Sequence, residues 1–230
     1  MIPLTLMRLT GFVRTGRALA PLIAGLVVLA VLYGGGQAQA GEAYGVSAVV
    51  IFPVLAWQTK LLLDVEPDVA RRLALVTVGS RGREAVAGLV AAGLAGIGTV
   101  AVALVLPWLL GGVVGPKDTG DLPLAEGIAL GVWAHLLVLP AAVALGALAS
   151  RAASDSPRYG VLILVGGVVG AIVFGLRDSV VPWLAPPMMA TARATTSGPT
   201  GVRVVELTVH ALLWSAAALA LYGWLRRRRA

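Results

Sequence analysis

Residues Leu124–Ala149 read LAEGIALGVWAHLLVLPAAVALGALA, and this stretch indicates the class of fold most directly. It contains no Lys or Arg, and Glu126 is its one acidic residue. A bilayer core is about 30 Å thick, so a helix needs about 20 mostly apolar residues to cross it. The stretch therefore predicts a transmembrane helix.

Five further segments meet the same requirement. They are residues 18–36, 45–63, 85–110, 159–176 and 205–225. The whole chain has 58% hydrophobic and 13% charged residues, whereas soluble domains usually have about 45–50% apolar residues. The sequence thus predicts an all-α polytopic membrane protein, in which residues 1–230 form a single transmembrane domain of six helices.

The basic residues lie mainly near the ends of these segments and on one side of the predicted membrane. Of the 18 Lys and Arg residues, 14 fall at the N-terminus, around residues 64–84, between the fourth and fifth helices, or at the C-terminus. Lys and Arg accumulate in cytoplasmic segments, so both termini and residues 64–84 are predicted to be cytoplasmic. Residues 1–17, with Arg8, Arg14 and Arg17 spaced along them, predict an amphipathic helix in the membrane interface.

The composition also bears on location and partners. The chain is rich in Ala, Val, Leu, Gly and Arg and lacks Asn, as is typical of proteins from GC-rich bacterial genomes. We therefore expect a bacterial cytoplasmic membrane protein whose surroundings are lipid. The net charge of +7 comes from residues that act as topology signals, so no nucleic-acid partner is expected.

Several common chemistries are excluded. A phosphate-binding loop needs Gly-Lys-Ser/Thr, but Lys60 follows Thr59 and Lys117 follows Pro116. The chain has no Cys and no HExxH motif, so no metal site is expected. An intramembrane serine protease needs Ser and His at membrane depth, and Ser197 falls in the predicted outer loop. We expect no catalytic residue, no cofactor and no enzymatic activity in this chain.

Four ionisable residues in or near the spans are candidates for intramembrane polar contacts. Glu126 and Glu206 fall near the outer ends of the fourth and sixth spans, where solvation at the helix end is the favoured interpretation. His135 and His210 fall within those spans. Helix–helix hydrogen bonds are the favoured interpretation for both histidines.

Small residues recur every four positions in the fifth predicted span, at Gly167, Ala171 and Gly175. Such a face allows two helix backbones to approach closely. The pattern predicts either packing within one subunit or a dimer interface, and the sequence does not separate the two.

The polar segment 64–84 is the most informative loop. It begins with acidic residues that include Glu66 and Asp68, and continues with Arg71, Arg72 and an apolar stripe. Proline favours the first position of a helix, so a short helix is predicted from about Pro67 to Val76. The turn that follows, TVGSR at residues 77–81, ends at Arg81.

Across the whole chain, the sequence resembles the membrane subunits of ABC-2 type ABC exporters. The likeness rests on the basic N-terminal helix, the six spans, the long 64–84 loop, and a segment broken by Pro and Gly at residues 177–204. The most specific part is the TVGSR turn, because the family typically has a Thr-Pro-Val-Ser-Arg-like turn there. Val78 and Gly79 stand where Pro-Val is usual.

The resemblance implies that the chain is a permease half-subunit of an ATP-driven exporter, moving a lipophilic or amphipathic substrate such as a drug, lipid, peptide or natural product. A separate ABC ATP-binding subunit would bind ATP and Mg²⁺, and the permease would form a homodimer within a 2+2 complex. An ion-coupled secondary transporter or channel, or a non-transporting membrane assembly subunit, is the alternative.

The resemblance also assigns roles to particular residues. The helix near 66–76 would be a coupling helix, and residues 177–204 would form short outer helices that act as an extracellular gate. Gly167, Ala171 and Gly175 would lie near the dimer interface and translocation path. The residues expected to contact the ATPase are Glu66, Asp68, Arg71, Arg72 and Arg81, and the first four are expected to lie in water.

Overall fold

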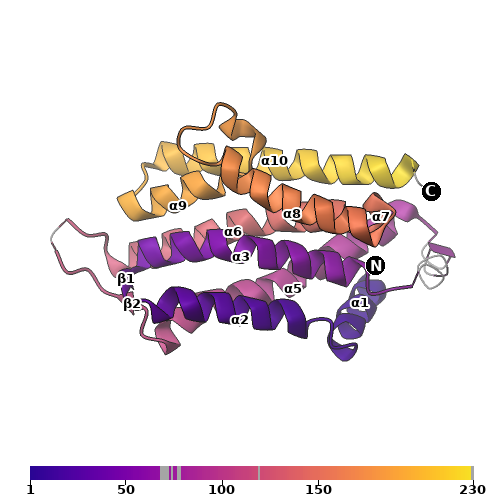
Figure 1. The fold of residues 1–230 in the computed structure, drawn as a ribbon, viewed down its shortest axis with the longest axis horizontal. Helices are drawn as coiled ribbons and strands as arrows, with labels where there is room; N and C mark the ends of the chain where they lie inside the picture. The colour runs from indigo at the N-terminus through magenta and orange to yellow at the C-terminus, as the bar shows by residue number, and fades with distance from the viewer. Residues whose placement is uncertain (68–72, 74, 77–78, 119, 229–230) are drawn as a thin grey trace.

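The computed structural model describes residues 1–67, 73, 75–76, 79–118 and 120–228 and is 79% helical. Figure 1 shows the arrangement of the helices. The long helices are α2 (Leu19–Gly34), α3 (Ala40–Leu63), α5 (Arg81–Leu109), α6 (Leu124–Ala149), α8 (Pro157–Phe174) and α10 (Gly201–Arg228). The shorter elements are α1 (Ile2–Arg14), β1 (Ala38–Gln39), β2 (Val113–Val114), α7 (Arg151–Ser154), the 3-10 turn η1 (Pro182–Leu184) and α9 (Met188–Ser197).

Helices cover all six predicted spans. Five of them, α3, α5, α6, α8 and α10, are long and apolar enough to cross a membrane. A sixth span is obtained if α1 and α2, which are bent by 70° relative to each other, are counted as one broken span. This is the architecture of a multi-pass helical membrane protein.

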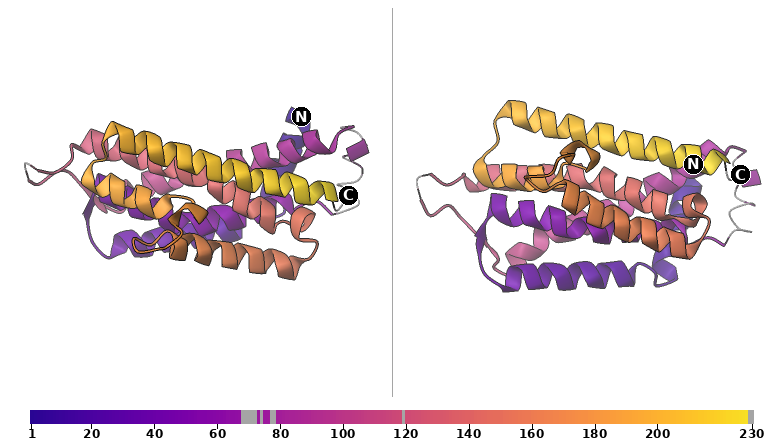
Figure 2. Two further views of the ribbon diagram at one scale, coloured as in Figure 1. Left: turned by 90° about the horizontal axis from the view of Figure 1, so that it is seen from above. Right: turned by 45° about the horizontal axis from the view of Figure 1, so that its top comes forward.

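The helices form an elongated bundle with both chain termini at the same end (Figure 1). We call this the terminal end; it carries α1, α7 and the last turn of α10. The opposite, distal end carries the parallel pair of β1 and β2 and the start of α10 (Figures 1 and 2). In the pairing, Ala38 lies opposite Val113 and Gln39 opposite Val114.

Helices α3 and α6 form the centre of the bundle. About 61% of the most apolar part of each is buried, against 28% in α5, 17% in α10 and 11% in α8. A side chain on Gly146 of α6 would collide with the backbone carbonyl of Ala56 and with Thr59 on α3. The missing side chain lets the two backbones approach closely, while α8 and α10 keep large apolar surfaces that can face lipid.

The segment between α8 and α10 folds back into the bundle. After α8 ends at Phe174, the chain forms η1 and then α9, which packs against the start of α3. A side chain on Gly45 would collide with Thr195, and would lie 2.9 Å from the carbonyl oxygen of Ala192. Short helices, η1 and α9, are therefore present before the last long helix, in the segment whose Pro and Gly content argued against a further continuous span.

Candidate functional site

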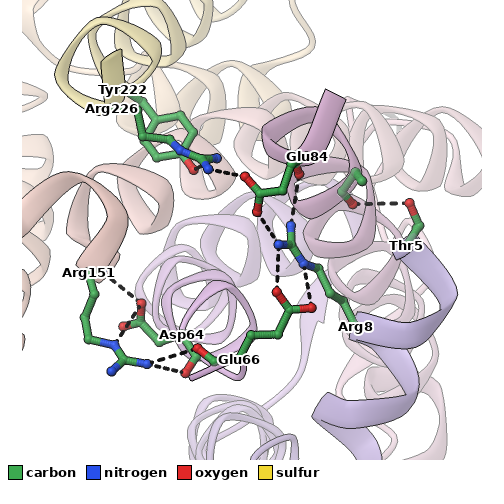
Figure 3. Close-up of polar contacts among 9 residues, drawn as sticks. Thr5, Arg8, Asp64, Glu66, Glu84, Arg151, Tyr222 and Arg226 are labelled. Carbon is green, nitrogen blue, oxygen red and sulfur yellow. Dashed lines mark hydrogen bonds and ion pairs between the residues drawn. The ribbon is translucent and has the colours of Figure 1, made fainter. Parts of the chain in front are cut away.

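Charged side chains from distant parts of the chain meet at the terminal end of the bundle (Figure 3). We call this group the charge cluster. Its members come from α1, the end of α3 and the residues after it, the start of α5, α7 and the end of α10. They are Arg8, Lys60, Asp64, Glu66, Glu84, Arg151 and Arg226.

Arg8 of α1 lies at the centre of the cluster, and its side chain is only 5% exposed. Its Nη2 and Nε donate to the two carboxylate oxygens of Glu66 at 2.9 and 3.2 Å. The same Nη2 also donates to the carboxylate of Glu84, while Nη1 donates to the backbone carbonyl of Glu84 at 3.0 Å. One guanidinium group thus joins α1 to both ends of the loop between α3 and α5.

Glu84 extends these contacts to the last helix. Its side chain is 2% exposed and also accepts a hydrogen bond from Arg226 of α10. Arg226 in turn donates to the hydroxyl of Tyr222 at 3.3 Å. Glu84 lies in the first turn of α5, where the helix dipole favours a negative charge. The Glu84 carboxylate therefore pairs with two arginines where α1, α5 and α10 meet.

Asp64 organises the other half of the cluster. Lys60 Nζ donates to its carboxylate at 2.8 Å, and so does the backbone N–H of Arg151 at 2.8 Å. The backbone carbonyl of Asp64 accepts hydrogen bonds from Arg17 at 2.7 Å and from Arg151 Nη2 at 3.0 Å. The residues that follow α3 are thereby tied to the segment between α1 and α2 and to α7.

The four basic and three acidic members of the cluster nearly cancel in charge. Burying an isolated charge is unfavourable, and pairing with hydrogen bonds offsets much of that cost. Removing one member would leave a buried partner without compensation, which is more destabilising than the loss of an exposed ion pair. The cluster should therefore hold its helices in a fixed arrangement.

The predicted contact residues for an ATPase have different environments. Glu66 was expected to lie in water, and this is wrong: its side chain is 10% exposed because it binds Arg8. Arg81 is the first residue of α5 and is exposed. Asp68, Arg71 and Arg72 lie outside the described residues. The contact of this loop with an ATPase stays a prediction.

The same loop also exposes apolar side chains. Leu73, Leu75 and Val76 are helical, and Leu73 and Val76 are 64% and 82% exposed. They follow the end of α3 and precede α5, so they lie beyond the long apolar helices at the terminal end. Large apolar side chains exposed outside the membrane-spanning part are suited to contact with a protein partner.

His135 is completely buried in α6 and is fully hydrogen-bonded. Its Nδ1 lies 2.8 Å from the backbone carbonyl of Gly131, and its Nε2 lies 3.1 Å from Ser47 Oγ on α3. A carbonyl can only accept, so Nδ1 carries a proton, and in the neutral ring Nε2 is then an acceptor for the Ser47 hydroxyl. The pair has the residue types of a nucleophile and base, but both residues are 0% exposed, so it links the two helices and is closed to substrate.

The other candidate polar residues are not brought together with His135. Glu126 is exposed in the first turn of α6, in agreement with solvation at a helix end. Glu206 is exposed and pairs with Arg203 at 2.7 Å. His210 differs from His135, because its Nε2 is buried without a hydrogen-bond partner among the described side chains.

The small-residue face of α8 packs within the chain. A side chain on Gly167 would collide with Leu145 of α6, and Ala171 is 5% exposed. A side chain on Gly175 would lie 3.0 Å from Met189 of α9. These three residues therefore pack within one chain. The predicted dimer contact through them would require α8 to move away from α6.

Sequence reasoning missed most of the charge cluster. The sequence analysis assigned Glu66 to contact with an ATPase and interpreted the basic members as topology signals. A signal was present, because every member except Arg8 lies within three residues of the end of a predicted apolar segment, and Arg8 lies in the basic N-terminal helix. The members that sequence analysis did not assign to a site are Arg8, Lys60, Asp64, Glu84, Arg151 and Arg226.

Comparison with protein-family models, with curated proteins and with solved structures finds no match for this chain. The fold and the site therefore define the protein by class. It is a multi-pass helical membrane protein whose terminal end is organised by a buried charge cluster.

Proposed function

We propose that this chain is the permease half-subunit of an ATP-driven ABC-2 type exporter that moves a lipophilic or amphipathic substrate out across the bacterial cytoplasmic membrane. The observation that supports this proposal is the charge cluster. It ties both ends of the loop between α3 and α5 to the N-terminal helix and to the last long helix.

Such a junction suits a loop on which a partner protein exerts force. Separating a buried ion pair by removing one member typically costs about 3–5 kcal/mol, so the pairs of the cluster resist being pulled apart. A displacement applied at Glu66 or Glu84 would then move α1, α5 and α10 together. This is how a cytoplasmic ATPase could change the arrangement of membrane helices without entering the membrane.

The exposed side chains of the loop fit a protein partner. Leu73 and Val76 expose large apolar surfaces at the terminal end, and the charged residues Asp68, Arg71 and Arg72 belong to the same loop. A separate ABC ATP-binding subunit would cover this surface and would itself bind ATP and Mg²⁺. In the proposed 2+2 complex, a second copy of the permease would contact the exposed face of α8.

Export driven by ATP is favoured over ion coupling. Ion-coupled transporters usually place ionisable residues at membrane depth. Here the ion pairs among the described residues lie in the charge cluster at the terminal end or at Arg203 and Glu206 near the distal end. His135, deep in the bundle, is fully used by a hydrogen bond between helices.

The first test is purification of the protein from its native membrane in several mild detergents, followed by mass spectrometry of stoichiometric companions. We expect an ATPase with a Walker motif at about one copy per chain. A homogeneous particle without an ATPase, found in every detergent, would refute the proposal. That result would favour a non-transporting membrane subunit.

A second test addresses the docking surface. Replacing Leu73 and Val76 together by Ser should release the ATPase while the permease stays folded, since both side chains are exposed. Val180→Ser is the matched control, because Val180 is 92% exposed but lies in the segment after α8. Full retention of the ATPase by the double variant would place the contact elsewhere.

A further inference from the structure

Helix α1 lies across the terminal end of the bundle and has three different faces (Figure 1). It is bent by 70° relative to α2. Because α2 runs alongside the membrane-spanning helices (Figure 1), α1 lies close to the membrane plane. Its first face is buried against α5 and α3 and consists of Leu4, Thr5, Arg8 and Phe12. The other two faces are exposed and differ in character.

The second face of α1 is apolar. Ile2, Leu6 and Val13 are 75%, 56% and 66% exposed, and at 3.6 residues per turn they point within about 40° of one another. Leu9 continues this face toward the bundle, where it packs against the hydrophobic core. The face is thus continuous with the apolar part of the bundle, and it suits contact with acyl chains at the membrane interface.

The third face of α1 carries Arg14, which is exposed. A side chain on Gly11, beside this face, would lie 3.3 Å from Val65, which follows the end of α3. This side of α1 therefore points away from the membrane-spanning part. Arg17 follows in the turn to α2 and is also exposed. Two arginines thus flank the corner between α1 and α2.

Helix α2 extends the apolar surface from this corner into the membrane. Leu19, Ile23, Val27 and Val31 recur every four residues and are between 55% and 74% exposed. We call these four residues the α2 stripe. It is about 18 Å long at 1.5 Å per residue, and a bilayer core is about 30 Å thick. The stripe therefore covers the depth of one leaflet and begins two residues after Arg17.

The exposed charges of the terminal end are nearly all positive. Among the described residues, seven arginines are exposed there and Asp155 is the one exposed acidic residue. The arginines are Arg14, Arg17, Arg81, Arg83, Arg158, Arg227 and Arg228. Asp64, Glu66 and Glu84 are held inside the charge cluster. At the distal end, four basic and five acidic side chains of the described residues are exposed. The terminal end is therefore complementary to an anionic membrane surface.

We propose that the corner between α1 and α2 binds an anionic phospholipid. Its phosphate lies between Arg14 and Arg17, one acyl chain follows the α2 stripe, and the other lies against the apolar face of α1. An anionic head group is favoured over a zwitterionic one, because a choline or ethanolamine group would add positive charge to a surface that already has an excess. The inference does not depend on export, since the same surface exists in a non-transporting protein.

The test is photolabelling of the full-length protein reconstituted in phosphatidylcholine vesicles. The probes are a phosphatidylglycerol and a phosphatidylcholine that carry the same diazirine on one acyl chain, each present in trace amount. We expect the phosphatidylglycerol probe to label peptides from residues 1–34 at least about tenfold more strongly, since each basic residue near an anionic surface contributes about fivefold. Equal labelling by the two probes would overturn the proposal.

Three double variants locate the site. Arg14→Gln with Arg17→Gln should reduce the preference to about twofold or less, whereas Arg14→Lys with Arg17→Lys should keep most of it because the charges remain. Arg158→Gln with Arg227→Gln is the matched control, since it removes the same charge from the same end but from α8 and α10. An equal loss in the lysine variant or in the control would overturn the assignment to this corner.

The orientation of α1 is tested separately with spin labels on single cysteines, since the chain has no cysteine of its own. Labels at Leu6→Cys and Val13→Cys should be accessible to molecular oxygen and protected from a water-soluble nickel chelate. Met7→Cys is the matched control, because Met7 is 53% exposed but points about 100° away from Leu6, and it should show the reverse. Equal accessibility at the three positions would overturn the proposal. So would protection of Leu6 and Val13 from both reagents in native membranes, because this would identify a protein as the occupant.

Discussion

Glu84→Gln is the sharpest test of the charge cluster. The substitution keeps the size of the side chain but removes the charge that Arg8 and Arg226 share. Removing one member of a buried ion pair costs about 3–5 kcal/mol. Arg8 keeps its bidentate contact with Glu66, and Arg226 keeps the Tyr222 hydroxyl. We therefore expect the lower end of that range, about 3 kcal/mol.

The loss can be measured as a change in the free energy of unfolding, by titration with SDS in mixed micelles followed through the fluorescence of the six tryptophans. A chain of this size typically loses about 2–4 °C in Tm for each kcal/mol, so Tm should fall by roughly 6–12 °C. Arg226→Met combined with Glu84→Gln should cost less than the sum of the single changes, because the two residues are coupled.

Glu206→Gln is the matched control in the same titration. Glu206 also pairs with an arginine, but the side chains of the pair are 62% and 45% exposed. Exposed pairs three residues apart contribute about 0.2–0.5 kcal/mol. If Glu84→Gln were no more destabilising than this control, the reasoning that burial makes the cluster a rigid junction would be refuted.

Three further outcomes are expected. Ser47→Ala should lower the free energy of unfolding by about 0.6–1.7 kcal/mol, as for other hydrogen bonds between membrane helices, and labelling of Ser47 by a fluorophosphonate would contradict the closed pair with His135. Gly146→Ala should destabilise by about 1–3 kcal/mol because a backbone carbonyl occupies the site of its Cβ, whereas Gly93→Ala, with no atom nearby, should be neutral or stabilising in the same titration. Trp214→Phe should release η1 from α10, seen as faster amide hydrogen exchange of residues 183–185, and unchanged exchange would show that the tryptophan hydrogen bond is not what holds the turn.

The membrane-spanning helices could be predicted because their cause is local. A helix that crosses lipid must be apolar over its whole length, and this requirement leaves a continuous run in the sequence. The segment Leu124–Ala149 accordingly has the same bounds in the prediction and in the structure. A helix at residues 1–17 separate from the first span was predicted, and α1 is bent by 70° relative to α2. The packing of α1 against α5 was not predicted, because it depends on residues far away in the chain.

The charge cluster could not be predicted because its cause is not local. Arg8 and Glu66 are 58 residues apart, and Glu84 and Arg226 are 142 residues apart. Glu66, Glu84 and Arg226 lie near the ends of apolar segments, and Arg8 lies in the basic N-terminal helix. Charges are expected at such places whether or not they pair, because basic residues there act as topology signals. Only the packing of the helices decides which charges meet. The same holds for Ser47 and His135, which are separated by 88 residues.

Helix α10 connects the charge cluster to η1. Along this helix, Arg226 follows Trp214 by 12 residues, or about 18 Å. Most of its surface is exposed, and its side-chain contacts with other elements include Thr208, Trp214 and Arg226. Because a helix transmits displacement along its axis far better than it stretches, a shift of the cluster that moved Arg226 would also move Trp214 and, through its hydrogen bond to Leu184, η1. The helix that closes the cluster is thus also the helix that holds η1, which provides a physical route from a partner at the terminal end to the segment between α8 and α10.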